Sequence, residues 1–266
     1  MNKLAINGGS KIITNQIKPH NSIGKEERKI VNKVVSSGKL SEFFGVWGKG
    51  FYGGKYVQKF EKECEKFFKV KYAIAVNSWT SGLICSVGAL DISPGDEIIV
   101  PTWTMSACAT SILVWNAIPV FADISYETYN LDPIDVEKKI TKKTKAIMAV
   151  DIFGHSAPIK ELKKIAKKYN LKIISDSAQS PGAKYGKSYA GTLTDIGGIS
   201  LNYHKHINTG EGGVIFTNSK HYADRMYLIR NHAESVVANK KVGSLQNLIG
   251  YNFRMGEIEA AIGITQ

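Results

Sequence analysis

Three short segments of the sequence combine residue types that could take part in chemistry. The first, residues 77–81 (Asn-Ser-Trp-Thr-Ser), follows an apolar run at 73–76 and precedes a helix-like stretch. The first N–H groups of a helix have no partner within the helix, and together with the helix dipole they attract anions. The segment therefore predicts an anion site, although small hydroxyl residues in such a place are also typical of an ordinary helix N-cap.

The second segment contains an acid, Asp176, and the third contains a lysine, Lys205. Asp176 directly follows the apolar run 171–175, and an acid at the carboxyl end of a strand faces the ligand crevice of an open α/β sheet. A helix cap or an ion pair would explain a lone acid equally well. Lys205 lies between Ser200 and the glycine-rich turn 210–213. A desolvated lysine can form a Schiff base with a carbonyl, whereas an isolated lysine is ordinarily solvated.

Taken together, the three segments predict a cofactor site. An anion cradle, an acid and a lysine are the groups that pyridoxal phosphate requires for its phosphate, its pyridine nitrogen and its aldehyde. We therefore expect pyridoxal 5'-phosphate as the cofactor. The three cysteines, Cys64, Cys85 and Cys108, form no C-x-x-C pair, so we expect no metal site and no disulfide framework. Each cysteine is expected to be a buried core residue.

The elements that must position these groups alternate along the chain from Tyr72 onward. Continuous apolar strands between amphipathic helices predict an α/β fold with a mainly parallel sheet sandwiched by helices. Ligands bind at the carboxyl ends of such strands, so functional residues are expected just after Val76, Val100, Val150 and Ser175. The expected strands are 73–76, 97–100, 119–122, 146–150 and 171–175, and the helices between them are 80–90, 107–114, 135–140 and 159–169.

The pattern also divides the chain into three parts. Residues 1–70 form an N-terminal helical and loop segment, with helices expected at 26–36 and 56–68. Residues 71–250 form a large α/β domain that binds the cofactor. Residues 251–266 are the third, short part.

Composition and charge limit the class of protein. The 266 residues are 43% hydrophobic and 22% charged, which is ordinary for a globular protein and excludes a disordered chain. The net charge is +12, but only four basic residues are arginine, and lysines crowd the polar face of stretches such as 160–168. Base-reading proteins depend on arginine and interleaved aromatic residues, so we expect no nucleic acid partner. No apolar run reaches the roughly 18 residues of a membrane span, and the N-terminus lacks an apolar signal region. We therefore expect a cytoplasmic protein without a membrane partner.

Five motifs in this order resemble those of the DegT/DnrJ/EryC1/StrS family of sugar aminotransferases, which are fold-type I pyridoxal phosphate enzymes. The resemblance spans about Leu4 to Gln266 and implies the large domain of that fold. The family continues for about a hundred residues beyond the match to Gln266, so we expect the small C-terminal domain to be mostly missing and residues 251–266 to begin the connection to it. The motifs are 94–101 (Pro-Gly-Asp-Glu-Ile-Ile-Val-Pro), 129–133 (Tyr-Asn-Leu-Asp-Pro), 176–179 (Asp-Ser-Ala-Gln), 200–213 (Ser at 200, Lys at 205, Gly-Glu-Gly-Gly from 210) and 250–255 (Gly-Tyr-Asn-Phe-Arg-Met).

The resemblance implies a role for each matching residue. Lys205 matches the lysine that bonds to the aldehyde of the cofactor and moves a proton between the amino donor and the cofactor. Asp176 matches the acid that pairs with the pyridinium nitrogen, and Gln179 matches the glutamine beside the 3'-hydroxyl. A homodimer is implied because part of the phosphate site comes from the neighbouring subunit. The phosphate contacts match Trp79, Thr80 and Ser200, with Asn252 reaching across from the neighbour and Arg254 in the same cross-subunit segment.

Two positions depart from the family pattern. The family usually has glycine at the position of Trp79; a backbone N–H still serves there, but the indole must find room. An aromatic residue commonly stacks on the cofactor ring one position after the match to Thr104, where this chain has Met105. Trp103 lies two positions back, on the same side of an extended strand. The stacking residue therefore stays open between Met105 and Trp103, and a buried core position is the other expectation for Trp103.

The resemblance also implies an activity: transfer of an amino group from L-glutamate to a 3- or 4-keto sugar nucleotide, for polysaccharide or glycosylated-metabolite synthesis. Some relatives are dehydratases with histidine in place of the lysine, and His204 and His206 flank Lys205. Lys205 stands five positions after Ser200 and five before Gly210, and this register favours lysine and transamination. A relative that aromatises its substrate, and a catalytically incomplete remnant that binds only the cofactor, stay as alternatives.

Overall fold

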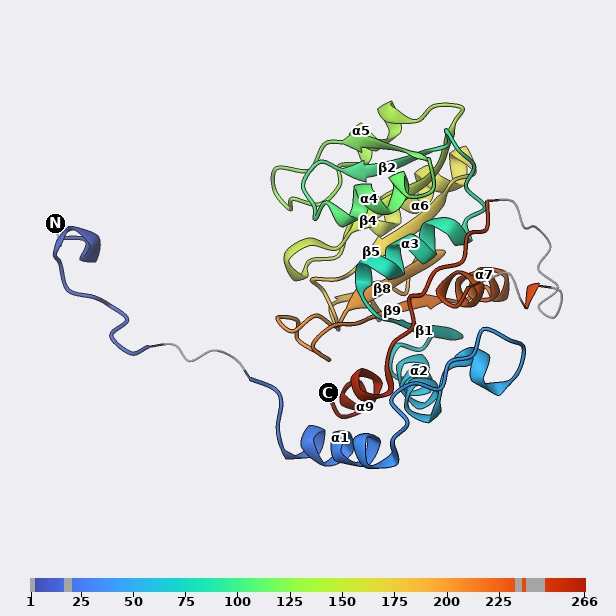
Figure 1. Cartoon of the computed structure of the whole chain (residues 1–266). Coiled ribbons are helices and arrows are strands. Elements are labelled where there is room, and N and C mark those ends of the chain that lie inside the picture. Colours follow the sequence, from blue (N-terminus) through green and yellow to red (C-terminus); the bar gives the residue numbers. More distant parts are fainter. Residues whose placement is uncertain (1–2, 17–20, 233–235, 238–246) are drawn as a thin grey trace.

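A seven-stranded sheet with helices on both faces forms the centre of the molecule (Figure 1). The computed structural model describes residues 3–16, 21–232, 236–237 and 247–266. The strands of the main sheet are β1 (Tyr72–Val76), β2 (Glu97–Pro101), β3 (Ile118–Ala122), β4 (Thr144–Val150), β5 (Lys172–Asp176), β8 (Ile196–Ser200) and β9 (Gly213–Thr217), and β6 (Lys184–Tyr185) pairs with β7 (Ser188–Tyr189) in a small ribbon. The α-helices are α1 (Lys25–Ser37), α2 (Lys55–Phe68), α3 (Trp79–Ala89), α4 (Ala107–Leu113), α5 (Pro133–Lys139), α6 (Ile159–Tyr169), α7 (Lys220–Arg230) and α9 (Glu257–Thr265), with 3-10 turns at η1 (Ala5–Asn7), η2 (Lys49–Tyr52) and η3 (Ile152–Gly154).

The order of the strands in the sheet is β1-β9-β8-β5-β4-β2-β3. Strands β3, β2, β4, β5 and β8 pair in parallel, and β9 pairs antiparallel with both β8 and β1. It follows that β1 runs in the same direction as the parallel strands. The carboxyl ends of these six strands therefore meet at one edge of the sheet, as the sequence pattern predicts for a mainly parallel sheet.

The five predicted strands and the six predicted helices are confirmed, with boundaries within two residues. Strands β8 and β9 and helix α7 were not predicted as elements. Glycine weakens a strand pattern because it adds no side chain to the packing, and β8 contains the pair Gly197-Gly198. The division into parts at 1–70, 71–250 and 251–266 stays a prediction.

Alternate residues of each strand face different layers, as the period of two requires. On one face, Ile74, Ile174 and Ile215 pack with residues of α3, α4 and α7 in a single core cluster. On the other face, α2 and α9 pack against β1, β8 and β9, and α5 and α6 pack against β2, β4 and β5. This alternation decides which side chains at the strand ends lie beneath α3.

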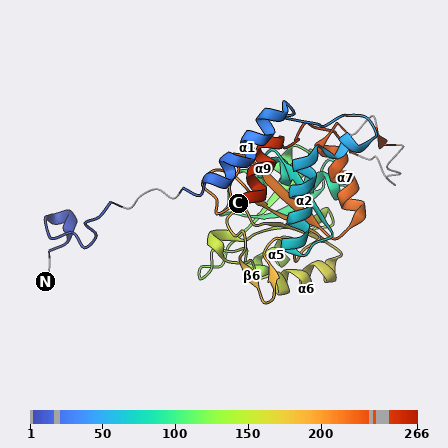
Figure 2. The same cartoon turned by 90° about the horizontal axis from the view of Figure 1, so that it is seen from below.

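Helix α9 packs against both α1 and α2 (Figure 2). The backbone N–H of Gly54 and that of Tyr56 donate to the buried Glu257 carboxylate, at 3.2 and 2.7 Å, where α2 begins. Gln266 at the end of the chain donates to Ser22 O and Glu27 Oε1. Helices α2 and α9 thus cover this face of the sheet, and α1 packs against α9.

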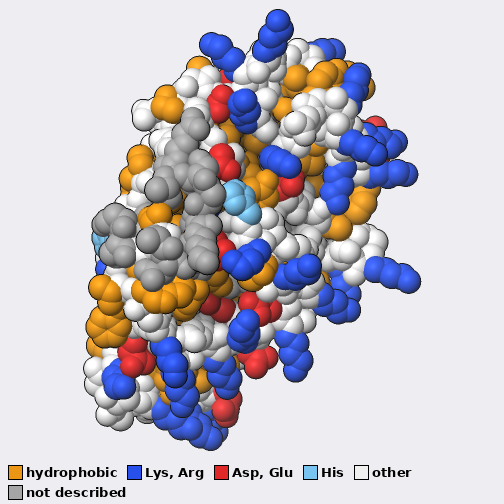
Figure 3. Space-filling model, turned by 90° about the vertical axis from the view of Figure 1, so that its right-hand side faces the viewer, with side chains coloured by type: hydrophobic (Ala, Val, Ile, Leu, Met, Phe, Trp, Pro, Cys, Tyr) orange, Lys and Arg blue, Asp and Glu red, His pale blue; other side chains and the backbone are white. Residues whose placement is uncertain are grey.

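Lysine side chains lie on the surface, as the sequence predicts. In α6, Leu162 and Ile165 are buried while Lys160, Lys163 and Lys164 are exposed. On the face shown in Figure 3, basic side chains are spread among acidic and hydrophobic ones. Within the described residues, no helix combines the length and the apolar character needed to cross a membrane.

Candidate functional site

Four of the predicted cofactor residues, Trp79, Thr80, Asp176 and Ser200, lie at the carboxyl edge of the sheet, at or beneath the start of α3. Val76, Gly213 and Ser200 are in register across β1, β9 and β8. Asp176, the last residue of β5, is in register with Gly198 of the neighbouring β8. The core residues Ile215, Ile196 and Ile174 pack on the α3 side of the sheet. An even number of positions along the same strand separates each of them from one edge residue: Gly213, Ser200 and Asp176, respectively. Their side-chain positions therefore all face the layer of α3.

The first turn of α3 presents free backbone N–H groups to this edge. Ser78 caps the helix, and its hydroxyl accepts from the N–H of Ser81 at 3.1 Å. Helix geometry leaves the N–H groups of Trp79 and Thr80 without intrahelical acceptors. A Cβ atom at Gly213 would lie 2.9 Å from Trp79 N, so glycine at this position keeps the approach to the N–H groups open. The arrangement is an anion cradle at a helix N-terminus.

Ser200 lies beside this cradle and is 6% exposed. Its hydroxyl accepts from the backbone N–H of Asn202 at 3.3 Å, and a hydroxyl that accepts one bond can donate another. A phosphate group at the start of α3 would thus meet backbone N–H donors and a hydroxyl donor. The predicted phosphate residues Trp79, Thr80 and Ser200 are brought together.

Asp176 is 4% exposed and is held by neutral donors. The indole Nε1 of Trp79 donates to Asp176 Oδ1 at 2.7 Å, and the backbone N–H of Ala178 donates to the same oxygen at 3.0 Å. Cys108 Sγ donates to Asp176 Oδ2 at 3.1 Å. In the part of the chain that the structure describes, no basic side chain forms an ion pair with Asp176. Because a buried carboxylate without a cation is unfavourable, the site fits a ligand that brings a positive charge to Asp176.

The thiol of Cys108 is a donor because it remains protonated. Burial, and then the nearby Asp176 carboxylate, raise the pKa of the Cys108 thiol well above its ordinary value. Thr104 Oγ1 lies 3.1 Å from the same sulfur. All three cysteines are buried and free, as predicted. The sequence does not reveal that one of them contacts the candidate acid.

A second buried acid, Asp151, follows β4 at the same edge. Its Oδ1 accepts from the backbone N–H of Ala157 at 2.7 Å, and its Oδ2 accepts from the hydroxyl of Ser177. Burial raises the pKa of Asp151 to about 6, against these two hydrogen bonds, with a further contribution from Asp176. Sequence reasoning did not name Asp151, although it lies directly after Val150, where functional residues were expected. Its hydrogen bonds hold the loop that follows Asp176.

Gln179 connects two loops of the site. Its Oε1 accepts from the backbone N–H of Phe153 at 2.9 Å, which joins the segment after β5 to the turn after β4. Phe153 has a left-handed φ of 53° and an exposed side chain. This hydrogen bond fixes the side-chain amide of Gln179, three residues after Asp176. The contact of Gln179 with the 3'-hydroxyl of the cofactor stays a prediction.

Lys205 lies in the loop between β8 and β9, and its side chain is half-buried. Its backbone N–H donates to Asn202 O at 2.8 Å, and two backbone bonds, from Thr209 to Leu201 and from Leu201 to Gly212, close the loop. The loop thus rises from the same edge that carries Ser200. No ion pair to Lys205 occurs within the described residues. The structure places Lys205 in the loop that follows Ser200, and no hydrogen bond or ion pair joins its side chain to Asp176.

Asn252 and Arg254 lie on a segment that runs beside the end of β1. Arg254 pairs with Val76 through a backbone bridge, and Phe253 O accepts from Asn77 N at 3.0 Å. Arg254 Nε donates to the exposed Asn252 side chain at 2.7 Å. The cross-subunit role of both side chains stays a prediction.

Trp103 and Met105 lie in the loop between β2 and α4. They are 55% and 70% exposed, so the expectation of a buried core position for Trp103 is wrong. The loop begins at the carboxyl end of β2, and the described residues leave the Trp103 and Met105 side chains largely uncovered. The choice of a stacking residue between the two stays open.

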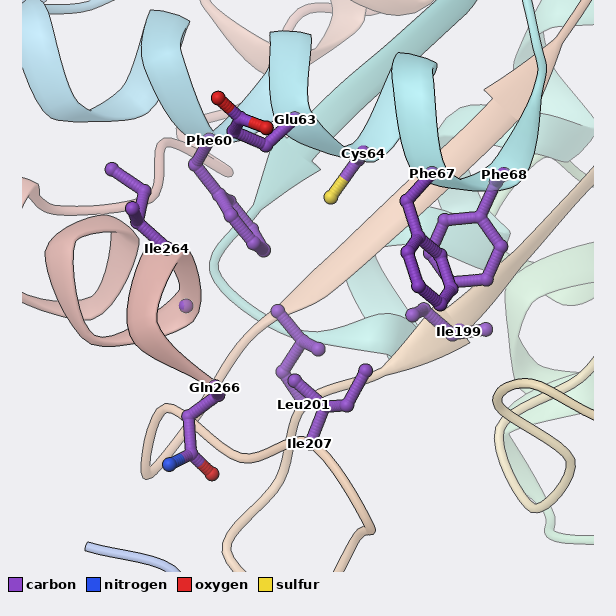
Figure 4. Close-up of a pocket in the computed structure, with 11 residues that line it drawn as sticks. Phe60, Glu63, Cys64, Phe67, Phe68, Ile199, Leu201, Ile207, Ile264 and Gln266 are labelled. Carbon is purple, nitrogen blue, oxygen red and sulfur yellow. The ribbon is translucent and has the colours of Figure 1, made fainter. Parts of the chain in front are cut away.

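A separate pocket of about 240 Å³ lies on the opposite face of the sheet (Figure 4). Aromatic side chains of α2, including Phe60 and Phe68, line one wall, and Leu201 and Ile207 line another. Gln266 lies at its rim. The pocket is apolar and lies away from Asp176. Among the described residues, no group of three or more His, Cys, Asp and Glu side chains could hold a metal ion.

Comparison with known proteins identifies the family of the chain. The model of the DegT/DnrJ/EryC1/StrS aminotransferase family matches residues 22–266. The chain belongs to this family. Two curated relatives are GDP-perosamine synthases: one from Vibrio cholerae, 37% identical over 92% of this chain and 63% of the relative, and one from Escherichia coli O157:H7, 38% identical over 92% and 64%. The chain thus spans less than two thirds of the length of these relatives.

Solved structures of similar proteins have the same fold. An aminotransferase from Psychrobacter cryohalolentis superposes with a TM-score of 0.83 at 31% identity, covering 94% of this chain and 63% of the other. A GDP-4-keto-6-deoxymannose-3-dehydratase with a trapped PLP-glutamate geminal diamine has a TM-score of 0.82 at 28% identity, covering 94% and 67%. The predicted fold class, the large α/β domain of fold-type I pyridoxal phosphate enzymes, is confirmed.

Proposed function

We propose that the chain forms the cofactor-binding part of a pyridoxal 5'-phosphate-dependent aminotransferase that transfers an amino group from L-glutamate to a keto sugar nucleotide. The observation that carries the proposal is the buried Asp176, which lacks a basic partner in the described chain and lies beside the open N-terminus of α3. The relatives named GDP-perosamine synthase support a sugar nucleotide as substrate.

The residues at the edge suit the three ends of the cofactor. The N–H groups of Trp79 and Thr80, with the Ser200 hydroxyl, would bind the phosphate. Asp176 would bind the protonated ring nitrogen, and its charge would favour that protonation. Gln179, fixed by the N–H of Phe153, would lie beside the 3'-hydroxyl. When bound, pyridoxal phosphate supplies an aldehyde for the amino donor and a ring that withdraws electrons from the donor's α-carbon.

Lys205 would serve as both the anchor and the base. Its Nζ would hold the cofactor through the aldehyde, whose oxygen leaves as water, until the amine of the donor takes its place. After the donor displaces it, Lys205 Nζ would take the proton from the α-carbon of glutamate and deliver it to that same aldehyde carbon. In the second half of the reaction Lys205 Nζ would move the proton in the opposite direction, toward the sugar carbon, whose ketone oxygen leaves as water.

A sugar dehydratase is the second candidate, since one solved relative is a 3-dehydratase. The resemblance gives such enzymes histidine at the position of the lysine. In this chain His204 and His206 are exposed, whereas Lys205 is half-buried in the loop. The five-residue spacing from Ser200 and to Gly210 also supports lysine at the anchoring position. We therefore favour transamination over dehydration.

The assembly and location follow from the same proposal. A homodimer would bring Asn252, and with it Arg254, to the phosphate of the neighbouring site. The cytoplasm is the compartment in which three free, buried cysteines are ordinarily maintained. The product would enter polysaccharide or glycosylated-metabolite synthesis.

The test is chemical capture of the cofactor. Borohydride reduction of the protein incubated with pyridoxal phosphate should fix the cofactor to one peptide, and mass spectrometry should locate it at Lys205. The Lys205→Ala variant should retain no label, whereas Lys187→Ala, a change in the turn between β6 and β7, should label normally. Labelling at another lysine would refute the anchoring role. Spectroscopic conversion of the cofactor to its amine form by L-glutamate separates an aminotransferase from a remnant that only binds the cofactor.

A further inference from the structure

The side chain of Trp79 is built into the site. The resemblance requires only its backbone N–H, yet the indole is 5% exposed and its Nε1 lies 2.7 Å from Asp176 Oδ1. The residue belongs to the first turn of α3, whereas Asp176 ends β5. The indole therefore connects the phosphate cradle directly to the candidate acid.

Two glycines make room for this indole. A Cβ atom at Gly198 of β8 would lie 2.2 Å from Trp79 Cζ3, and one at Gly82 of α3 would lie 2.6 Å from Trp79 Cε3. Real side chains do not approach so closely, so any larger residue would displace the ring. Glycine inside a helix or strand costs about 0.5–1 kcal/mol relative to alanine. Glycine nevertheless occupies both positions against which the Trp79 ring packs, Gly82 and Gly198.

The two oxygens of Asp176 are not equally occupied. Oδ1 accepts from Trp79 Nε1 and from Ala178 N, which fills its two lone-pair positions. Oδ2 accepts only from Cys108 Sγ among the described residues, so one lone pair of Oδ2 remains for a ligand. Because the three donors approach from α3, α4 and the residue two positions on, the carboxylate cannot rotate without breaking a hydrogen bond.

We propose that Trp79 is a positioning residue, whose indole N–H, together with the thiol of Cys108, locks the Asp176 carboxylate so that Oδ2 receives the ring nitrogen of the cofactor. This inference rests on the proposed function, because it requires pyridoxal phosphate at the site. The departure from the usual glycine thus adds a contact to the acid. The phosphate contact is unaffected, since it uses the backbone of Trp79.

A matched pair of variants tests the inference. Trp79→Phe keeps an aromatic ring against Gly82 and Gly198 but removes the donor to Asp176. Trp115→Phe is the control. The buried indole of Trp115 donates to Ile84 O at 2.8 Å and packs against Gly88, and both of these residues belong to α3. Both variants lose one buried indole hydrogen bond, and only the first loses the contact with Asp176.

The readouts are the affinity for pyridoxal phosphate and the ¹⁵N NMR signal of ring-labelled cofactor. Trp79→Phe should weaken binding about tenfold and move the ring-nitrogen signal toward that of the neutral, unprotonated form. Trp115→Phe should leave the ring-nitrogen signal unchanged and the affinity within about twofold. Equal behaviour of the two variants would overturn the inference.

A second pair keeps the test decisive if Trp79→Phe does not fold. Cys108→Ala removes the donor to Oδ2 and should move the ring-nitrogen signal in the same direction. Cys85→Ala, at another fully buried cysteine, should not move it. An unmoved signal in Cys108→Ala would overturn the role of the thiol in the lock.

The failure of the proposed function is recognised separately. If the wild-type chain binds no pyridoxal phosphate, the proposed function fails. The cofactor-free protein then tests the contact itself, because Asp176→Asn should move the indole N–H resonance of Trp79 and leave that of Trp115 in place. If the Trp79 resonance does not move, the contact between the indole and the carboxylate is refuted without reference to any cofactor.

Discussion

The stability of the fold should depend on the protonation of Asp151, and an asparagine at this position should remove the dependence. The carboxyl group accepts from the N–H of Ala157 and from the hydroxyl of Ser177. An asparagine can keep both bonds, since its carbonyl oxygen accepts from Ala157 and its amide can donate to the Ser177 oxygen. Asp151→Asn therefore changes the titration of the site while it preserves the packing.

The magnitude follows from the pKa of Asp151, which burial raises from 3.8 to about 6. Between these pH values the folded chain holds a proton that the unfolded chain has released. The free energy of unfolding therefore falls as the pH rises from about 4 to about 6, and the contribution is lost above that. At about 1.4 kcal/mol per unit of pKa, the loss is about 3 kcal/mol. For a domain of this size it corresponds to about 6–12 °C in Tm.

The assay is thermal unfolding of wild type and Asp151→Asn at pH 4, 5, 6 and 7, followed by circular dichroism. The Tm of Asp151→Asn minus the Tm of wild type should increase by about 6–12 °C between pH 4 and pH 7. Asp123→Asn, at an exposed carboxylate near the end of β3, controls for the loss of a negative charge. A constant difference in Tm between wild type and Asp151→Asn from pH 4 to pH 7 would refute the reasoning.

Three further predictions concern the supports of the site. Glu61→Ala leaves the fully buried Arg230 without its carboxylate partner at 2.6 Å, so urea unfolding should show a loss of about 3–5 kcal/mol; a loss below about 1 kcal/mol would contradict this. Gly198→Ala places a Cβ atom 2.2 Å from Val214 O and 2.2 Å from the Trp79 ring, so it should lower the free energy of unfolding by about 3 kcal/mol. Gly45→Ala is its control: a Cβ atom there meets nothing within 4 Å, and the free energy of unfolding should change little. Asn252→Ala should weaken cofactor retention in a dimer confirmed by light scattering; unchanged retention would count against its cross-subunit role.

The sequence predicts the frame of the site well because that frame depends on local patterns. Apolar runs of strand length and amphipathic helices have periods that can be read from a single chain. The carboxyl edge of a parallel sheet is then a geometric consequence, so the placement of Asp176 follows from the end of one strand. The same reasoning places Asp151, which was not named only because no second motif pointed to it.

Contacts between distant segments could not be predicted in this way. The sequence gives Trp79 a place at the start of a helix, but the direction of its indole depends on Gly198, which is 119 positions away in the chain. Cys108 is predicted to be a small core residue, and it is one; its role as a donor depends on its contact with Asp176, which is 68 positions away in the chain. Strand β8 was not predicted for a related reason: Gly198, one of the two glycines that weaken its pattern, also makes room for the indole.

The position of Trp79 shows how a phosphate cradle leaves a side chain free for other use. A helix N-terminus binds an anion through backbone N–H groups, and any residue except proline can supply them. The side chain at this position is therefore limited only by the space around it. Here Gly82 and Gly198 provide that space, and Asp176 provides a partner for the indole N–H. One residue can thus contribute its backbone to the phosphate end of the site and its side chain to the acid at the other end.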